Sequence, residues 1–136
     1  MLELIKSISE RCYNAAVKRG KDVTENGCLS ALFTEMIELS QAISNNTPIN
    51  PLPLYEIHNH LSDDYFVTAY SRLHNSIPDE IADVIITLAT CYHAEVDKNL
   101  LAETVESFKE RIAPDIMDMV EASVMLKMRY NELRED

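Results

Sequence analysis

Glycine content constrains this fold more than any other feature, because the chain of 136 residues contains only Gly20 and Gly27. No run of residues alternates β-branched and polar side chains in the way that a strand requires. The five prolines fall between stretches in which apolar residues recur at helical spacing. The sequence therefore predicts an all-α fold, a helical bundle of about five helices.

Capping and helix-breaking residues mark the ends of the predicted helices. Arg19 and Gly20 close the first helix, and Ser76 with Pro78 opens the third. Between the second and third helices, residues 45–76 form a proline-rich insertion, a long loop that holds a short helix around residues 63–73. The five main helices are expected at about residues 2–18, 24–44, 76–95, 99–112 and 114–130.

The length and composition indicate a single domain over residues 1–136, large enough to bury a core without disulfides or a structural metal. The formal net charge of −11 argues against general attraction to nucleic-acid polymers or anionic membranes, but a lone nucleotide can still bind through a metal ion and a few cations. No signal peptide and no apolar stretch of about 20 residues is evident. We expect a cytoplasmic protein whose widely spaced cysteines are buried, reduced thiols: Cys12, Cys28 and Cys91.

The predicted third helix is apolar around most of its circumference, which indicates a position in the interior. Its one polar stripe contains Glu80, Asp83, Thr87 and Thr90. Glu80 and Asp83 are three residues apart, so both carboxylates project from the same side of a largely buried helix.

The predicted second helix carries a similar pair, Glu35 and Glu38, beside the small residues Ala31 and Ala42. Small residues let a neighbouring helix approach closely, which would set the acids of the two helices opposite each other. Four carboxylates in a low-dielectric interior repel one another or take up protons unless a cation lies among them. An all-oxygen ligand set favours Mg²⁺, Mn²⁺ or Ca²⁺, and the absence of any Glu-x-x-His motif disfavours a di-iron bundle.

Acidic pairs at this spacing also arise by chance in a chain with 23 acidic residues. Glu103 with Glu106 and Asp115 with Asp118 are two further pairs, which we interpret as solvated helix faces. The pairs on the second and third helices differ from these, because those two helices carry the heaviest apolar load.

Three segments of the chain resemble motifs of the all-α NTP pyrophosphohydrolases, the superfamily that includes MazG-like proteins and the dimeric dUTPases. The segments are TEMIELSQAI, DEIADVIITLAT and KMRYNELR, which resemble the family's E-x-x-E, E-x-x-D and K-x-x-(Y/F)-N-x-x-R motifs. The resemblance covers about residues 10–44, 77–97 and 118–134. It implies a Mg²⁺-dependent enzyme, with Mn²⁺ as a substitute, that hydrolyses an NTP or dNTP to the monophosphate and pyrophosphate, a reaction suited to nucleotide-pool house-cleaning.

The resemblance also implies roles for individual residues. The metal ligands that it implies are Glu35, Glu38, Glu80 and Asp83. It favours Glu38 as the catalytic residue that accepts the proton of the attacking water. The substrate-binding residues that it implies are Lys127, Tyr130, Asn131 and Arg134. From the residues alone, Lys127 and Arg134 also fit an ordinary cationic helix end, and Tyr130 equally fits a core position.

A non-catalytic helical interaction module is the alternative function that the sequence leaves open. The helices have more apolar circumference than one small bundle core can cover, which predicts self-association. The resemblance implies a homodimer or homotetramer. The expected partners are therefore a nucleoside triphosphate and further copies of the chain, with the loop at residues 45–76 as the expected selectivity element.

Overall fold

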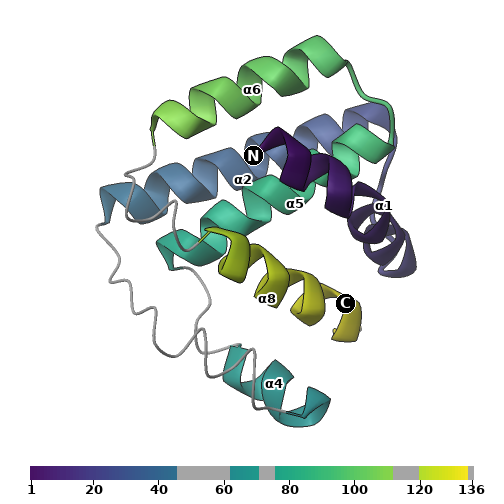
Figure 1. Ribbon diagram of the computed structural model, residues 1–136, viewed down its shortest axis with the longest axis vertical. Coiled ribbons are helices and arrows are strands. Elements are labelled where there is room, and N and C mark those ends of the chain that lie inside the picture. Colours follow the sequence, from purple (N-terminus) through teal and green to yellow (C-terminus); the bar gives the residue numbers. More distant parts are fainter. Residues whose placement is uncertain (46–61, 71–75, 112–119, 135–136) are drawn as a thin grey trace.

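The computed structural model describes residues 1–45, 62–70, 76–111 and 120–134, and every regular element in these ranges is a helix (Figure 1). The helices are α1 (Leu2–Lys18), α2 (Glu25–Ser44), α4 (Asp63–Tyr70), α5 (Ile77–His93), α6 (Lys98–Glu110) and α8 (Val120–Leu133). The all-α prediction is confirmed for this part of the chain, and α4 is the short helix expected within the insertion. None of these helices has the length and hydropathy needed to cross a lipid bilayer.

Side-chain N-caps begin α2 and α5, and the one on α5 was predicted. Thr24 caps α2, and its Oγ1 accepts a hydrogen bond from the backbone N–H of Gly27 at 3.2 Å. Ser76 caps α5, and its Oγ accepts from the backbone N–H of Asp79 at 3.3 Å. Gly27 also permits a close approach, because a Cβ at this position would lie 2.3 Å from Cγ of Asp22.

Other helix ends depart slightly from the prediction. α6 begins earlier than expected, because the Asp97 carboxylate caps it by accepting from the backbone N–H groups of Asn99 (2.9 Å) and Leu100 (3.2 Å). α5 ends earlier, at His93, and α8 continues past its expected end to Leu133. The start predicted for the last helix, at residue 114, lies outside the described residues.

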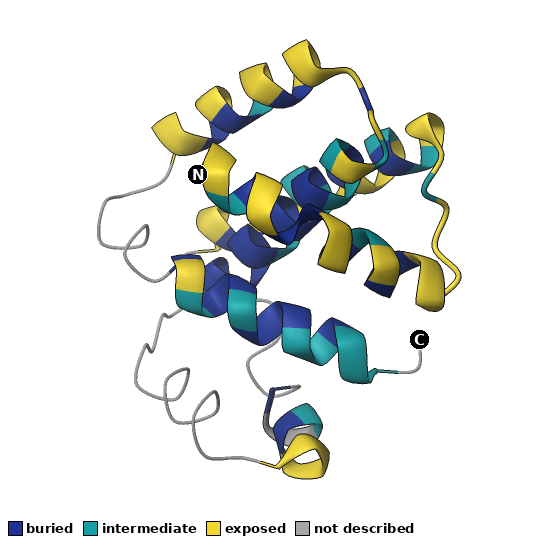
Figure 2. Cartoon of the chain, turned by 45° about the vertical axis from the view of Figure 1, so that its right-hand side comes forward, coloured by how far each residue is buried: buried dark blue, intermediate teal, exposed yellow. Residues whose placement is uncertain are grey.

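α5 is the central helix of the described structure. α1, α2 and α8 all pack against it, and α6 contacts its C-terminal side (Figure 1). Figure 2 shows buried residues along most of α5, whereas α6 turns one exposed face outward. Ile81, Val84 and Ile85 have no exposed surface. The predicted interior position of this helix is confirmed, so the polar side chains it carries lie next to the core.

α4 packs against α8. Phe66 and Tyr70 of α4 form, with Leu126 of α8, a small apolar cluster separate from the main core. Arg129 adds an ion pair with Asp63 at 2.9 Å, and its guanidinium lies 4.2 Å from the centroid of the Phe66 ring. Residues 46–61 and 71–75 lie outside the described residues, so the long loop predicted there stays a prediction.

The three cysteines are free and buried, as predicted. Cys91 on α5 donates from Sγ to the backbone oxygen of Cys28 on α2 at 3.5 Å. Burial raises the pKa of Cys12 and of Cys91 to about 12. These thiols therefore remain protonated at neutral pH and act as packing groups.

Candidate metal centre

Four carboxylates from two helices meet between α2 and α5. One oxygen from each lies within 4.8 Å of the oxygens of the other three, and the residues are Glu35, Glu38, Glu80 and Asp83. We call these four residues the acidic cluster. The sequence places the two pairs on separate helices, and the structure brings them together.

The acidic cluster spans the boundary between core and surface. Glu80 is only 3% exposed and Asp83 is half-buried, whereas Glu38 is exposed. The three-residue spacing points both members of a pair the same way, and the packing of α2 against α5 sets the pairs face to face. Because Glu38 is exposed, an ion from solvent can reach the cluster.

Burial and mutual repulsion raise the pKa of three members of the cluster. Burial is the largest cause for Glu35, whose pKa rises to about 8 with further contributions from Asp83 and Glu38. Burial and the neighbouring Asp83 raise the pKa of Glu80 to about 7. The pKa of Asp83 rises to about 6, because burial outweighs the opposing effect of Lys127. Without a cation, the cluster therefore holds protons or strongly repelling charges at neutral pH.

Two oxygens of the acidic cluster are buried and have no hydrogen-bond partner among the described residues, namely Oε2 of Glu35 and Oε2 of Glu80. Buried acceptors nearly always find a donor, because an unpaired one costs about 1–3 kcal/mol. A set of carboxylate oxygens with unpaired acceptors fits a hard divalent cation, whereas zinc and iron sites usually include nitrogen or sulfur ligands. The residues present therefore fit the Mg²⁺ or Mn²⁺ that the sequence predicts.

Lys127 of α8 lies next to the acidic cluster and is only 2% exposed. Its Nζ is 3.1 Å from Oδ1 of Asp79 and 3.1 Å from Oδ1 of Asp83. Tyr70 of α4 donates its hydroxyl hydrogen to the same oxygen of Asp79. Lys127 is buried in the middle of α8, so its interpretation as an ordinary cationic helix end is wrong. Its role as a substrate contact stays a prediction.

The other three predicted substrate residues lie along the end of α8. Tyr130 packs with Tyr70 at a ring-centroid distance of 4.9 Å, as its alternative core position requires. The Arg134 guanidinium lies 5.2 Å from the centroid of the Tyr130 ring, and its Nη1 donates to Oδ1 of Asn131 at 3.4 Å. Asn131 is buried. The structure thus brings Asn131 and Arg134 together, and sets Tyr130 against α4.

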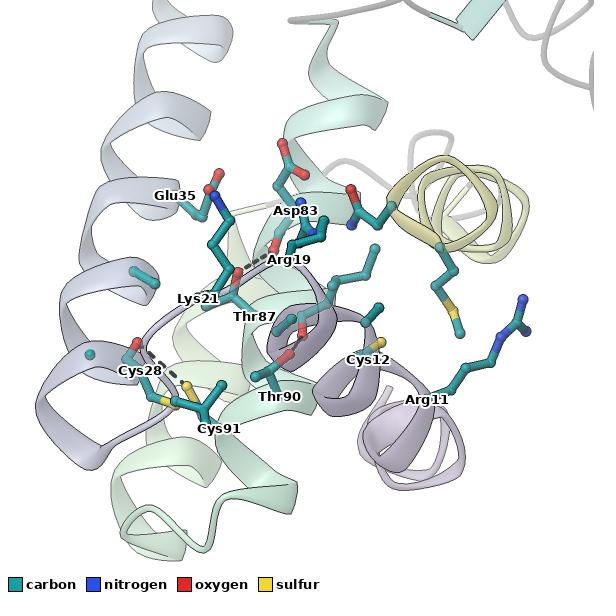
Figure 3. A pocket seen from close by; sticks show the side chains of 18 of the residues that line it. Arg11, Cys12, Arg19, Lys21, Cys28, Glu35, Asp83, Thr87, Thr90 and Cys91 are labelled. Carbon is teal, nitrogen blue, oxygen red and sulfur yellow. Dashed lines mark hydrogen bonds between the residues drawn. The ribbon is translucent and has the colours of Figure 1, made fainter. Parts of the chain in front are cut away.

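A cavity of about 350 Å³ adjoins the acidic cluster between α1, α2, α5 and α8. Glu35 and Asp83 line one end, and Thr87 and Thr90 continue the wall along α5 toward Cys91 (Figure 3). Three of the four residues of the predicted polar stripe, Asp83, Thr87 and Thr90, therefore line this cavity.

Cationic residues gather around this cavity although the chain is acidic overall. Those that line it are Arg11, Arg19, Lys21 and Arg134. Arg19 and Lys21 flank Gly20, whose φ of +73° turns the chain at the end of α1. Figure 3 shows the Lys21 side chain extending toward the end of the cavity where Glu35 lies. Asp22 and Glu132 also line the cavity, and Glu132 forms an ion pair with Arg11 at 2.6 Å. The mixture of acids and cations is compatible with a metal-bound polyanion.

Sequence reasoning missed Asp79 and Tyr70. Asp79 lies four residues before Asp83, so the two share a helix face, and this spacing was a signal that could have identified Asp79. No comparable signal pointed to Tyr70, because it lies in the proline-rich insertion, where no periodicity relates it to α5. The cavity also has no sequence signature, since its lining comes from four helices.

The acidic pairs interpreted as solvated faces are only partly within the described residues. Glu103 and Glu106 are exposed on α6, as predicted. Asp115 and Asp118 lie outside the described residues.

No protein-family model, curated protein or solved structure matches this chain. The similarity to all-α NTP pyrophosphohydrolases therefore stays a prediction from the three motifs.

Proposed function

We propose that this protein is a Mg²⁺-dependent nucleoside triphosphate pyrophosphohydrolase that converts an NTP or dNTP to the monophosphate and pyrophosphate. The observation that carries this proposal is the acidic cluster with its two buried, unpartnered oxygens, on Glu35 and Glu80. Carboxylate sets that hold Mg²⁺ with several retained waters are common in enzymes that act on phosphate esters and anhydrides. Mn²⁺, with the same preference for oxygen ligands, is an expected substitute.

The acidic cluster would hold the metal, which when bound supplies neutralisation of phosphate charge and a lower pKa for a coordinated water. Glu38 is the proposed base, because it is the exposed member of the cluster and can meet a water from solvent. The water oxygen bonds to the α-phosphorus, and the bond from that phosphorus to the bridging oxygen breaks. The water proton passes to the Glu38 carboxylate, and pyrophosphate leaves from the monophosphate.

The cavity beside the acidic cluster supports the proposal, because it offers space for the rest of the substrate. A volume of about 350 Å³ lies near the lower end of the range for small-molecule sites. Arg134 is the proposed phosphate contact in its lining, and Asn131 the proposed contact with base or sugar. Substrate contacts by Lys127 and Tyr130 stay predictions, since neither residue lines the cavity.

Self-association as a homodimer or homotetramer is also part of the proposal. Phe33 and Ile37 lie one turn apart on α2 and are 70% and 45% exposed. Large exposed apolar side chains that share a helix face often mark subunit contacts. Sedimentation velocity at micromolar concentration is expected to show a species larger than the monomer, and a monomer alone would rule out this part of the proposal.

Pyrophosphate release from a panel of ribo- and deoxynucleoside triphosphates, with Mg²⁺ or with EDTA, tests the function directly. We expect release from at least one substrate with Mg²⁺ and none with EDTA. No release from any substrate, in a protein that also binds no Mg²⁺, would favour the non-catalytic interaction module.

A further inference from the structure

Lys127 lies between two aspartates of α5 in a buried ion-pair network. Its Nζ is 3.1 Å from Oδ1 of Asp79 and 3.1 Å from Oδ1 of Asp83, and the side chains of Lys127, Asp79 and Asp83 are 3%, 2% and 15% exposed. Asp83 belongs to the acidic cluster, whereas Asp79 does not. The lysine therefore touches the proposed cation site through one of its ligands.

The positive charge of Lys127 is shared by two carboxylates, because Nζ lies 3.1 Å from Oδ1 of Asp79 and 3.1 Å from Oδ1 of Asp83. One ammonium and two ionised carboxylates leave one negative charge in excess, so the network can still attract a cation to the acidic cluster. Since a carboxylate has two oxygens, Asp83 can be held at Oδ1 and still offer Oδ2 to the cluster.

Two tyrosines, Tyr70 and Tyr130, lie beside the buried Lys127 ammonium. Tyr70 donates its hydroxyl hydrogen to Asp79, and the Lys127 ammonium lies 5.6 Å from the Tyr70 ring centroid and 5.7 Å from that of Tyr130. Lys127 does not line the cavity that adjoins the cluster. A phosphate in that cavity would meet Asp83 before it met Lys127.

We infer that Lys127 is a positioning residue, which fixes the Asp83 carboxylate toward the cation while Asp79 and Tyr70 hold the lysine in place. This inference rests on the cation site of the proposed function, although not on the hydrolysis of any nucleotide. It gives Lys127 a different role from the phosphate contact that the motif resemblance implies.

The test measures Mn²⁺ binding to the full chain, with free Mn²⁺ followed by electron paramagnetic resonance. Lys127→Met removes the ammonium but leaves the buried Asp79 carboxylate without the positive charge beside it, so this single variant has a folding cost of its own. The double variant Asp79→Asn/Lys127→Met removes both charges of the pair, and the new amide side chain keeps an oxygen that accepts from Tyr70. The control is Lys109→Met, at an exposed lysine of α6. Far-UV circular dichroism and a thermal melt in EDTA check that each variant is folded.

Because residues that orient a metal ligand typically account for a factor of 10 to 100 in metal affinity, we expect the folded double variant to bind Mn²⁺ about 10- to 100-fold more weakly than the wild type. The control should bind like the wild type. Wild-type affinity in the folded double variant would overturn the inference, because Asp83 would then need no lysine. A raised substrate KM with unchanged Mn²⁺ affinity would also overturn it, in favour of direct phosphate contact.

The same measurements separate this inference from the proposed function. A wild-type protein that binds Mn²⁺ but hydrolyses no triphosphate would refute the proposed activity, and weaker binding by the double variant would still support the role of Lys127. A wild-type protein that binds no Mn²⁺ would overturn both.

Discussion

Helices α5 and α6 each carry an acidic pair at the same three-residue spacing, and these two pairs have opposite surroundings. On α5, Glu80 is 3% exposed and, together with Asp83, meets the two glutamates of α2. On α6, Glu103 and Glu106 are exposed, and Oε1 of Glu106 lies 3.9 Å from Nζ of Lys109. Spacing alone therefore does not distinguish a site from a solvated surface. The apolar residues around each pair do, because they decide which helix is drawn into the interior.

Because the two pairs differ in burial, they differ in their cost to the free energy of folding. An exposed carboxylate keeps its hydration and costs the fold little, whereas a buried carboxylate without a partner is strongly unfavourable. Oε2 of Glu80 is buried and has no hydrogen-bond partner among the described residues, and the pKa of Glu80 is raised to about 7. A bound cation, as proposed, would offset this cost. Exchanging or removing members of the two pairs tests this contrast.

The largest expected effect is on catalysis. We expect Glu80→Gln to lower the rate of pyrophosphate release by at least about 100-fold, because it removes a proposed metal ligand. The matched change on α6, Glu103→Gln, should leave the rate within about twofold, as is usual for a surface substitution. Release from the best substrate of the triphosphate panel, at saturating Mg²⁺, is the measurement. Equal rates for the two variants would remove the distinction between the pairs.

The next effect is on stability as a function of pH in the absence of metal. Between pH 4.5 and about 8, the folded protein keeps protons on Glu80 and Glu35 that the unfolded chain has lost, since their folded pKa values are about 7 and about 8. The free energy of unfolding should therefore fall as pH rises through this window. Urea unfolding in EDTA across this range measures the slope. Glu80→Gln should flatten it and Glu103→Gln should not; a slope of opposite sign in the wild type would contradict the prediction.

Mg²⁺ should stabilise the protein only while the pair on α5 is intact. A ligand at 100 times its Kd adds about 2.7 kcal/mol to the free energy of unfolding, which is a rise in Tm of roughly 8 °C for a domain of this size. We expect this shift in the wild type and in Glu103→Ala, but not in Glu80→Ala. Differential scanning calorimetry at neutral pH, with Mg²⁺ or EDTA, compares the three. If wild type and Glu80→Ala responded alike, the cation would have to bind elsewhere.

The smallest effect is expected on α6 itself. Glu106→Gln removes an exposed ion pair with Lys109, in which the glutamate side chain is 72% exposed. Pairs of this kind are worth at most about 0.5 kcal/mol, and salt screens them. Urea unfolding at low and at high salt should show a small loss that disappears with salt. A loss greater than about 1 kcal/mol would indicate that this pair has a structural role that its exposure does not suggest.

Local signals predicted the helices and the acidic cluster. Ser76 and Pro78 identified the start of α5 because capping and proline preferences act within one turn, and the interior position of α5 followed from its apolar circumference. Glu35 with Glu38, and Glu80 with Asp83, could be paired because a three-residue spacing fixes direction on each helix.

The parts that sequence reasoning did not predict depend on contacts between distant segments. Tyr70 reaches Asp79 because α4 packs against α8, and no local pattern encodes that packing. The burial of Lys127 likewise depends on how α8 lies against α5, since a lysine side chain is usually solvated. The cavity arises only after four helices have packed.

The unpaired oxygens of Glu35 and Glu80 bear on the lifetime of the protein in a cell. Under the proposed cation binding, the folded protein should lose stability when divalent ions become scarce, and proteases should then cleave the unfolded population. Because a change of about 1–2 kcal/mol in stability can alter abundance several-fold, the amount of folded protein should rise and fall with the supply of the ion. The half-life of the protein in cells depleted of Mg²⁺, compared between wild type and Glu80→Gln, would reveal whether the proposed cation site also protects the protein from degradation.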